Sequence, residues 1–167
     1  SVPYFFNEYW YIKRFEKGKD YPIYTRKYKS LESDEEILLD VNKLASKHAY
    51  YSIGSISVST NNKILAYSFD TLSRRLYSIK FLDLKTKKEF KETIKNTTGS
   101  ITWANDNKTI FYSKKEEKTL RVNKIYRHQL NSDLKNDVLV FEEKDDQFST
   151  GVYKTKSQEF LIIASRS

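Results

Sequence analysis

A dense cluster of carboxylates occurs in the segment EEKDD at 142–146, which brings Glu142, Glu143, Asp145 and Asp146 close together. Paired carboxylates act as a general acid and base when a pocket tunes their pKa values. Without such a pocket, they form either an electrostatic contact for a basic partner domain or cationic peptide, or a solvated turn. We therefore treat these carboxylates as candidate contact residues, with the solvated turn as the alternative.

A second candidate is the arginine pair Arg74 and Arg75, in the segment DTLSRRLY at 70–77. A guanidinium group offers a planar fork of donors that suits a carboxylate across an interface. The pair falls in a turn between two predicted strands, so an exposed turn is the simpler interpretation. An interdomain or peptide contact is the functional one.

Nothing else in the sequence has the spacing of a catalytic, cofactor or metal site. The glycines lie too far apart for a nucleophile elbow or a phosphate-binding loop. The two histidines, His48 and His128, have no second metal ligand at a suitable spacing, and we assign both a structural or exposed role. Cysteine is absent, which excludes thiol chemistry and disulfides. We expect no catalytic residue, cofactor or metal in this chain.

The composition favours a folded domain rich in strands. Apolar residues make up 38% and aromatic residues 15%, and aromatic side chains suit pleated sheets. The net charge of +8 permits a nucleic-acid partner, but the basic residues are mostly Lys spread along the chain, which favours solvated strand faces. No apolar run is long enough to span a membrane. We expect no nucleic-acid or membrane partner and a cytoplasmic location, with the periplasm as the alternative if a signal peptide has been removed.

The elements that position these residues are indicated by an internal repeat. Residues 54–68 (GSISVSTNNKILAYS) and 99–113 (GSITWANDNKTIFYS) share an opening Gly-Ser-Ile, a turn rich in Asn and an apolar strand that ends in Tyr-Ser. Residues 151–165 (GVYKTKSQEFLIIAS) match more loosely. A period of about 45 residues with four strands per unit is typical of propeller blades.

Alternating apolar and polar residues give the approximate strands of each unit. In the first unit the predicted strands are 53–59, 63–70, 77–84 and 89–94. In the second they are 99–104, 109–114, 124–130 and 138–142. The pattern predicts an all-β fold, a partial β-propeller of about three to four blades of four-stranded antiparallel sheet. The predicted organisation is a partial blade at 1–45, a blade at 46–96, a blade at 97–146 and a partial blade at 147–167.

The N-terminal part contains the remains of an earlier blade. Residues 9–15, 21–28 and 36–41 are predicted to form its second to fourth strands. A short helix is predicted within 40–48, with Asp40 as its N-terminal cap. A few blades form an open arc, so we expect exposed blade edges that favour self-association.

In order and spacing, seven strings of this sequence resemble the N-terminal propeller of serine peptidases of the prolyl oligopeptidase family, in its oligopeptidase B group. The resemblance covers essentially the whole chain. The strings are YIKRFEKGKDYPIYTRK (11–27), LDVNK (39–43), HAYYSIGSISVSTNNKILAYSFD (48–70), SRRLYSIKFLDL (73–84), ITWANDNKTIFY (101–112), KIYRHQL (124–130) and VFEEKDDQF (140–148).

The resemblance implies a parent protein with two parts, a seven-bladed propeller and an α/β-hydrolase domain that holds a Ser, Asp and His triad. No position of this chain matches the triad motifs. The parent is implied to cleave short peptides after Arg or Lys, while the propeller controls access to the active site. Family members often have an acidic residue where Arg74 and Arg75 stand, so a salt bridge built on that carboxylate is not expected here.

We therefore predict a non-catalytic propeller segment of a serine oligopeptidase, inactive by itself. Its implied partners are the C-terminal catalytic domain and, for the parent, short basic peptides as substrates. The alternative is a propeller-type binding module that binds a protein or a polyanion through its basic surface.

Overall fold

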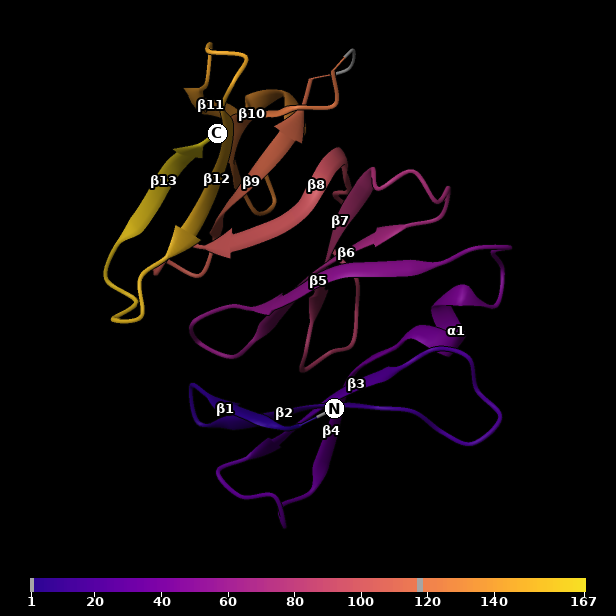
Figure 1. Cartoon of the computed structure of the whole chain (residues 1–167). Coiled ribbons are helices and arrows are strands. Elements are labelled where there is room, and N and C mark those ends of the chain that lie inside the picture. The colour runs from indigo at the N-terminus through magenta and orange to yellow at the C-terminus, as the bar shows by residue number, and fades with distance from the viewer. Residues whose placement is uncertain (1, 117–118) are drawn as a thin grey trace. The chain divides into compact units, whose positions relative to one another are not determined.

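The computed structural model describes residues 2–116 and 119–167, and antiparallel strands dominate it (Figure 1). The all-β prediction is confirmed. The chain divides into two compact units, Ser1–Tyr51 and Ser52–Ser167. Within the described ranges, no helix is long and apolar enough to cross a membrane.

The first unit is a four-stranded antiparallel meander in the order β1-β2-β3-β4. Its strands are β1 (Tyr4–Phe6), β2 (Tyr9–Arg14), β3 (Ile23–Tyr28) and β4 (Glu35–Asp40). Three of them match the predicted strands, whereas β1 was not predicted. A two-residue turn joins β1 to β2, and both of its residues, Asn7 and Glu8, have positive φ. This is the geometry that fits the twist of a tight hairpin.

The predicted short helix is present as α1 (Val41–Ala45). Asp40 caps it, because its side chain accepts a hydrogen bond from the Asn42 amide at 3.1 Å. The Asn42 side chain then accepts from the Tyr21 amide at 3.1 Å and donates to the Tyr21 carbonyl at 2.9 Å. This pair of bonds fastens the helix to the segment that precedes β3.

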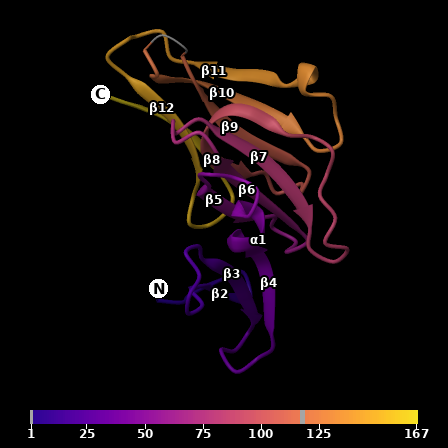
Figure 2. The ribbon, with the colours of Figure 1, turned by 90° about the vertical axis from the view of Figure 1, so that its right-hand side faces the viewer.

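The second unit contains a seven-stranded sheet and a separate two-stranded sheet. Figure 2 shows the strands of the larger sheet in succession from β5 to β11. They are β5 (Ser52–Val58), β6 (Ile64–Asp70), β7 (Tyr77–Asp83), β8 (Ile94–Trp103), β9 (Thr109–Lys115), β10 (Val122–Gln129) and β11 (Val138–Glu142), with a short 3-10 helix at Leu134–Asn136. The smaller sheet consists of β12 (Ser149–Lys154) and β13 (Leu161–Arg166).

One prediction in this unit was wrong. A separate fourth strand was expected at 89–94, followed by a new strand at 99–104. Instead, β8 is one continuous strand that pairs with β7 through its first half and with β9 through its second half. It appears in Figure 1 as one long curved strand. Residues near 89 form only a single bridge, between Leu82 and Glu89.

The change of partner along β8 occurs at Gly99. The register of β8 against β9 shifts between Thr97 and Ile101, and Gly99 has φ +89°. A Cβ at Gly99 would lie 2.9 Å from Cγ of Tyr77, and a Cβ at Gly54 would lie 2.7 Å from Cε1 of the same ring. The two glycines that open the repeats are therefore required because the Tyr77 ring packs against both of them.

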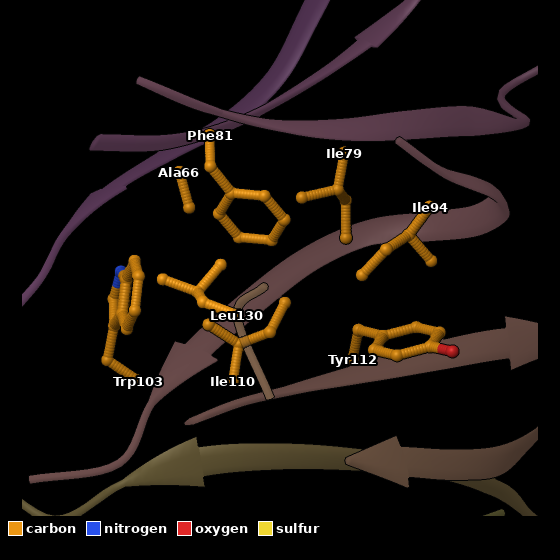
Figure 3. Packing of buried hydrophobic residues seen from close by; sticks show 8 residues of the cluster. All are labelled: Ala66, Ile79, Phe81, Ile94, Trp103, Ile110, Tyr112 and Leu130. Atoms are coloured by element: carbon orange, nitrogen blue, oxygen red, sulfur yellow. The ribbon is translucent and has the colours of Figure 1, made fainter. Parts of the chain in front are cut away.

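The core of the second unit lies between consecutive repeats. Figure 3 shows side chains from β6 and β7 facing side chains from β8 and β9. Phe81 and Trp103, one from each side, meet edge to face with ring centroids 6.2 Å apart. The cluster is Ala66, Ile79, Phe81, Ile94, Trp103, Ile110, Tyr112 and Leu130. Such packing of sheet on sheet is what the predicted blades require.

Side-chain hydrogen bonds also join equivalent positions of consecutive repeats. The indole N–H of Trp103 donates to the Ser57 carbonyl at 3.0 Å, and the hydroxyl of Thr102 donates to the Val152 carbonyl at 3.1 Å. Turn residues are joined in the same way. These bonds link Asn61 with Asn107 and Asn105 with Gln158. The partners lie between 46 and 53 residues apart, which is close to the repeat period inferred from the sequence.

Gly54→Ala is expected to lower the free energy of unfolding by about 1–3 kcal/mol, because the new methyl group must displace the Tyr77 ring. Gly151→Ala is the matched control, since no atom outside its chain neighbours lies within 4 Å of a Cβ built there. Urea unfolding followed by circular dichroism measures both. Equal effects of the two substitutions would contradict the role assigned to Tyr77.

Candidate functional site

The arginine pair lies in a turn that Asp70 organises. The buried Asp70 carboxylate accepts hydrogen bonds from the amides of Leu72 and Arg75, each at 2.8 Å. Arg75 has φ +54°, so the backbone reverses at the pair itself. The side chains of Arg74 and Arg75 are both exposed. The fold therefore fixes the backbone of this turn and leaves the two guanidinium groups in solvent.

The acidic run begins at the last residue of β11 and continues into a loop that folds partly onto itself. Glu142 is 3.4 Å from Nζ of Lys124 on the neighbouring strand. The Glu143 carboxylate accepts from the Asp145 amide at 3.1 Å, and the Asp145 carboxylate accepts from the Gln147 amide at 3.0 Å. Three of the four predicted contact carboxylates thus have partners within the loop and its strand. Asp146 is exposed.

Arg121, which the sequence analysis did not single out, holds this acidic loop. Its guanidinium donates to the carbonyls of Asp145 and Phe148 at 2.5 and 2.6 Å, and to the carbonyl of Glu143 at 3.2 Å. Three carbonyls on one guanidinium fix the loop backbone, and the positive charge offsets the neighbouring carboxylates. The acidic loop is consequently an ordered feature of the surface.

The two predicted clusters are not in contact with each other in the described part of the chain, but one hairpin holds both. Lys115, at the end of β9, donates from Nζ to the Arg75 carbonyl at 3.1 Å. Arg121, shortly before β10, holds the acidic loop. We call the turns 71–76 and 143–148, together with Lys115 and Arg121, the hairpin edge. Its exposed charges suit contact with a charged partner, and it contains no nucleophile paired with a base.

His128 has the structural role that the sequence analysis predicted, and His48 is exposed. The His128 ring is fully buried, and its Nδ1 lies 2.6 Å from Oδ1 of Asp137. The hydroxyl of Tyr112 donates to Oδ2 of the same carboxylate at 2.7 Å. Burial, followed by the Asp137 carboxylate, raises the pKa of Tyr112 well above its usual value. We call Tyr112, His128 and Asp137 the buried polar network.

The buried polar network is structural rather than catalytic. The imidazole of His128 stacks on Phe81, with ring centroids 6.0 Å apart. Its Nε2 lies 3.9 Å from the Glu92 carboxylate, whose side chain is only 8% exposed. A substrate cannot reach an imidazole enclosed in this way. In the described residues, no group of three His, Asp or Glu side chains is arranged to hold a metal ion.

In the second unit, consecutive repeats of antiparallel sheet pack on a shared core, as the blades of a β-propeller do. All of it, residues 1–167, matches the family described as "Prolyl oligopeptidase, N-terminal beta-propeller domain". The chain therefore belongs to the prolyl oligopeptidase family, as its N-terminal propeller domain.

Named relatives agree with this assignment. The chain is 35% identical to dipeptidyl aminopeptidase BI of Pseudoxanthomonas mexicana and 34% identical to protease 2 of Moraxella lacunata, in each case over 100% of its own length. It spans only 25% of the length of either relative.

Solved structures give the same result. Oligopeptidase B from Leishmania major superimposes with a TM-score of 0.95 at 32% identity, and the match covers 100% of this chain and 24% of that one. Oligopeptidase B from Trypanosoma brucei, in a closed form with covalently bound antipain, gives a TM-score of 0.90 at 30% identity, again over 100% of this chain and 24% of that one.

Arg121→Ala is expected to loosen the acidic loop, because three backbone carbonyls lose their donor. Hydrogen exchange of the amides in 143–148 should accelerate by about tenfold or more. Arg74→Ala removes one positive charge from an exposed position of the same edge and should leave this exchange unchanged. Equal acceleration in both variants would show that net charge, and not the carbonyl contacts, orders the loop.

Tyr112→Phe is expected to destabilise the protein by about 1–3 kcal/mol, since the buried Asp137 carboxylate loses a donor. Tyr126→Phe provides the comparison, because Tyr126 is the half-buried cross-strand neighbour of Tyr112. Its replacement should change the unfolding free energy by less than about 0.5 kcal/mol. Denaturant titrations of the two variants measure the difference. Similar losses of unfolding free energy in both would show that the buried polar network has no special role in stability.

Proposed function

We propose that this chain is the non-catalytic propeller part of a serine oligopeptidase that hydrolyses short peptides after Arg or Lys. The observation that carries the proposal is the match to oligopeptidase B over the full length of the chain, at 32% identity and a TM-score of 0.95. Because the chain covers 24% of that protein, the activity is assigned to the remainder of a longer polypeptide.

The residues of the chain support a role as a wall of the active-site chamber. In the described residues, the one His–Asp pair is buried, and the exposed charges of the hairpin edge belong to turns whose backbone is held by the side chains of Asp70 and Arg121. Interfaces between domains of one chain are commonly polar, and such charges set the orientation of the partner. In this proposal, Arg74, Arg75 and Asp146 contact the catalytic domain.

The proposed mechanism of the propeller is exclusion by size. A rigid wall over the nucleophile admits short, extended peptides and keeps folded proteins out. Opening and closing of the two parts would admit the substrate and complete the site. Packing between repeats supplies the rigidity, because buried side chains and interrepeat hydrogen bonds hold the successive sheets together.

The test compares the 167-residue chain with the polypeptide extended through the rest of its reading frame. The chain alone should give no turnover of an Arg-p-nitroanilide peptide. The extended protein should cleave Arg and Lys substrates at least about tenfold faster than a Pro substrate, as judged by kcat/KM. It should also leave intact a folded protein that exposes Arg–X bonds.

Two results would contradict the proposal. One is turnover by the chain alone that survives repurification and replacement of every Ser. The other is an extended protein that prefers Pro substrates or cleaves the folded protein as fast as a short peptide. The first would place catalysis within this chain, and the second would remove the specificity or the exclusion by size.

A further inference from the structure

The second unit contains a cavity of about 570 Å³ that neither the predicted contacts nor the proposed function uses. The cavity lies between residues 93–96 of one repeat and residues of β9, β10 and the 3-10 helix of the next. Three lysines line it, namely Lys95, Lys114 and Lys135. Its volume falls in the range of small-molecule sites.

The charge in this cavity is positive and largely uncompensated. Lys95 and Lys114 have no carboxylate within ion-pair distance in the described part of the chain. Lys135 is 3.1 Å from Asp133, but both side chains are mostly exposed, so water screens the pair. Asp137 is the one carboxylate of the lining, and its oxygens are hydrogen-bonded to Tyr112 and His128.

Two stacked tyrosine rings lie beside the lysines of this cavity. Tyr112 and Tyr126 are cross-strand neighbours whose rings are nearly parallel, at 18°, with centroids 5.7 Å apart. Nζ of Lys114 lies over both rings, 5.0 Å from the centroid of Tyr126 and 5.8 Å from that of Tyr112. The stacked rings hold the Lys114 ammonium beside the cavity, which lowers the entropy cost of using it as a ligand contact.

A larger cavity nearby, of about 790 Å³, has two lysines in its lining but four carboxylates, so it suits an anion less well. Its carboxylates are already engaged. Asp83 accepts from the amides of its own turn, Glu89 accepts from the Tyr67 hydroxyl and the Lys80 ammonium, and Glu92 accepts from the Asn131 amide. The smaller cavity is therefore the better site for an anion, because its lining has three lysines and one carboxylate.

We propose that the cavity at Lys95, Lys114 and Lys135 binds a small organic phosphate that carries a flat ring. The ammonium groups neutralise the phosphate, for which Lys serves well as a point charge. The ring of the ligand packs on the half-buried Tyr126. All the residues involved lie in one unit of the chain, and none of them is among the contacts named in the proposed peptidase function.

The test is a titration of the 167-residue protein with phenyl phosphate, followed by NMR chemical shifts and calorimetry at two salt concentrations. Phenyl phosphate should bind saturably with a dissociation constant of about 1 mM or lower, and at least about tenfold more tightly than inorganic phosphate. Parallel titrations with adenosine monophosphate and O-phosphotyrosine identify which kind of ring the site prefers.

Substitutions separate a defined site from general charge attraction. Lys114→Gln should weaken phenyl phosphate by at least about tenfold, because one charge-assisted contact is lost. Lys63→Gln removes the same charge from an exposed turn outside the cavity and should leave the affinity unchanged. Tyr126→Leu should reduce the preference for phenyl phosphate over inorganic phosphate while phosphate binding persists.

Three outcomes would overturn the proposal. The first is the absence of saturable binding by phenyl phosphate, and the second is an equal loss of affinity in the Lys114→Gln and Lys63→Gln variants. The third is an unchanged preference for phenyl phosphate after Tyr126→Leu. Circular dichroism of each variant confirms that the fold is retained.

Discussion

The second unit depends on the course of β8, which leaves the sheet of one repeat and enters the sheet of the next at Gly99. The positive φ of Gly99 allows the change of direction, and the Tyr77 ring occupies the space that two missing Cβ atoms leave open. Because β8 passes between the repeats, β6 and β7 face β9 instead of lying in one flat sheet with it. The shared core around Phe81 and Trp103 follows from this arrangement.

The sequence allowed the repeats and most strands to be predicted because their causes are local. Strands β5, β6, β7, β9, β10 and β11 begin and end within two residues of the expected positions. Strand β1 was missed because its turn, Asn7-Glu8, lacks the glycine that usually marks a tight hairpin. The continuity of β8 was missed because it depends on pairing with two distant strands, which the alternation of residues does not reveal.

For the candidate site, the sequence predicted which residue types form it but not the contacts that they make. The sequence indicated charged turns at Arg74–Arg75 and at 142–146; the first is a bend in the structure, and the second is a loop that begins after Glu142, the last residue of β11. It did not indicate Arg121, because the partners of its guanidinium are backbone carbonyls between 22 and 27 residues away. The sequence also did not predict that buried His128 contacts Asp137, because this contact depends on how the chain folds back against β10 after the 3-10 helix. Contacts between side chains and distant backbone leave no periodic signal in a sequence.

The buried polar network shows why a His, an Asp and a Tyr in contact need not form an active site. Asp137 is 6% exposed at its side chain, and its carboxylate accepts from His128 and Tyr112. A buried carboxylate is tolerated only with such donors, so the network is first a condition of folding. Tyr112 and Asp137 also line the cavity beside Lys95 and Lys114, so two residues of the network connect the core with that cavity.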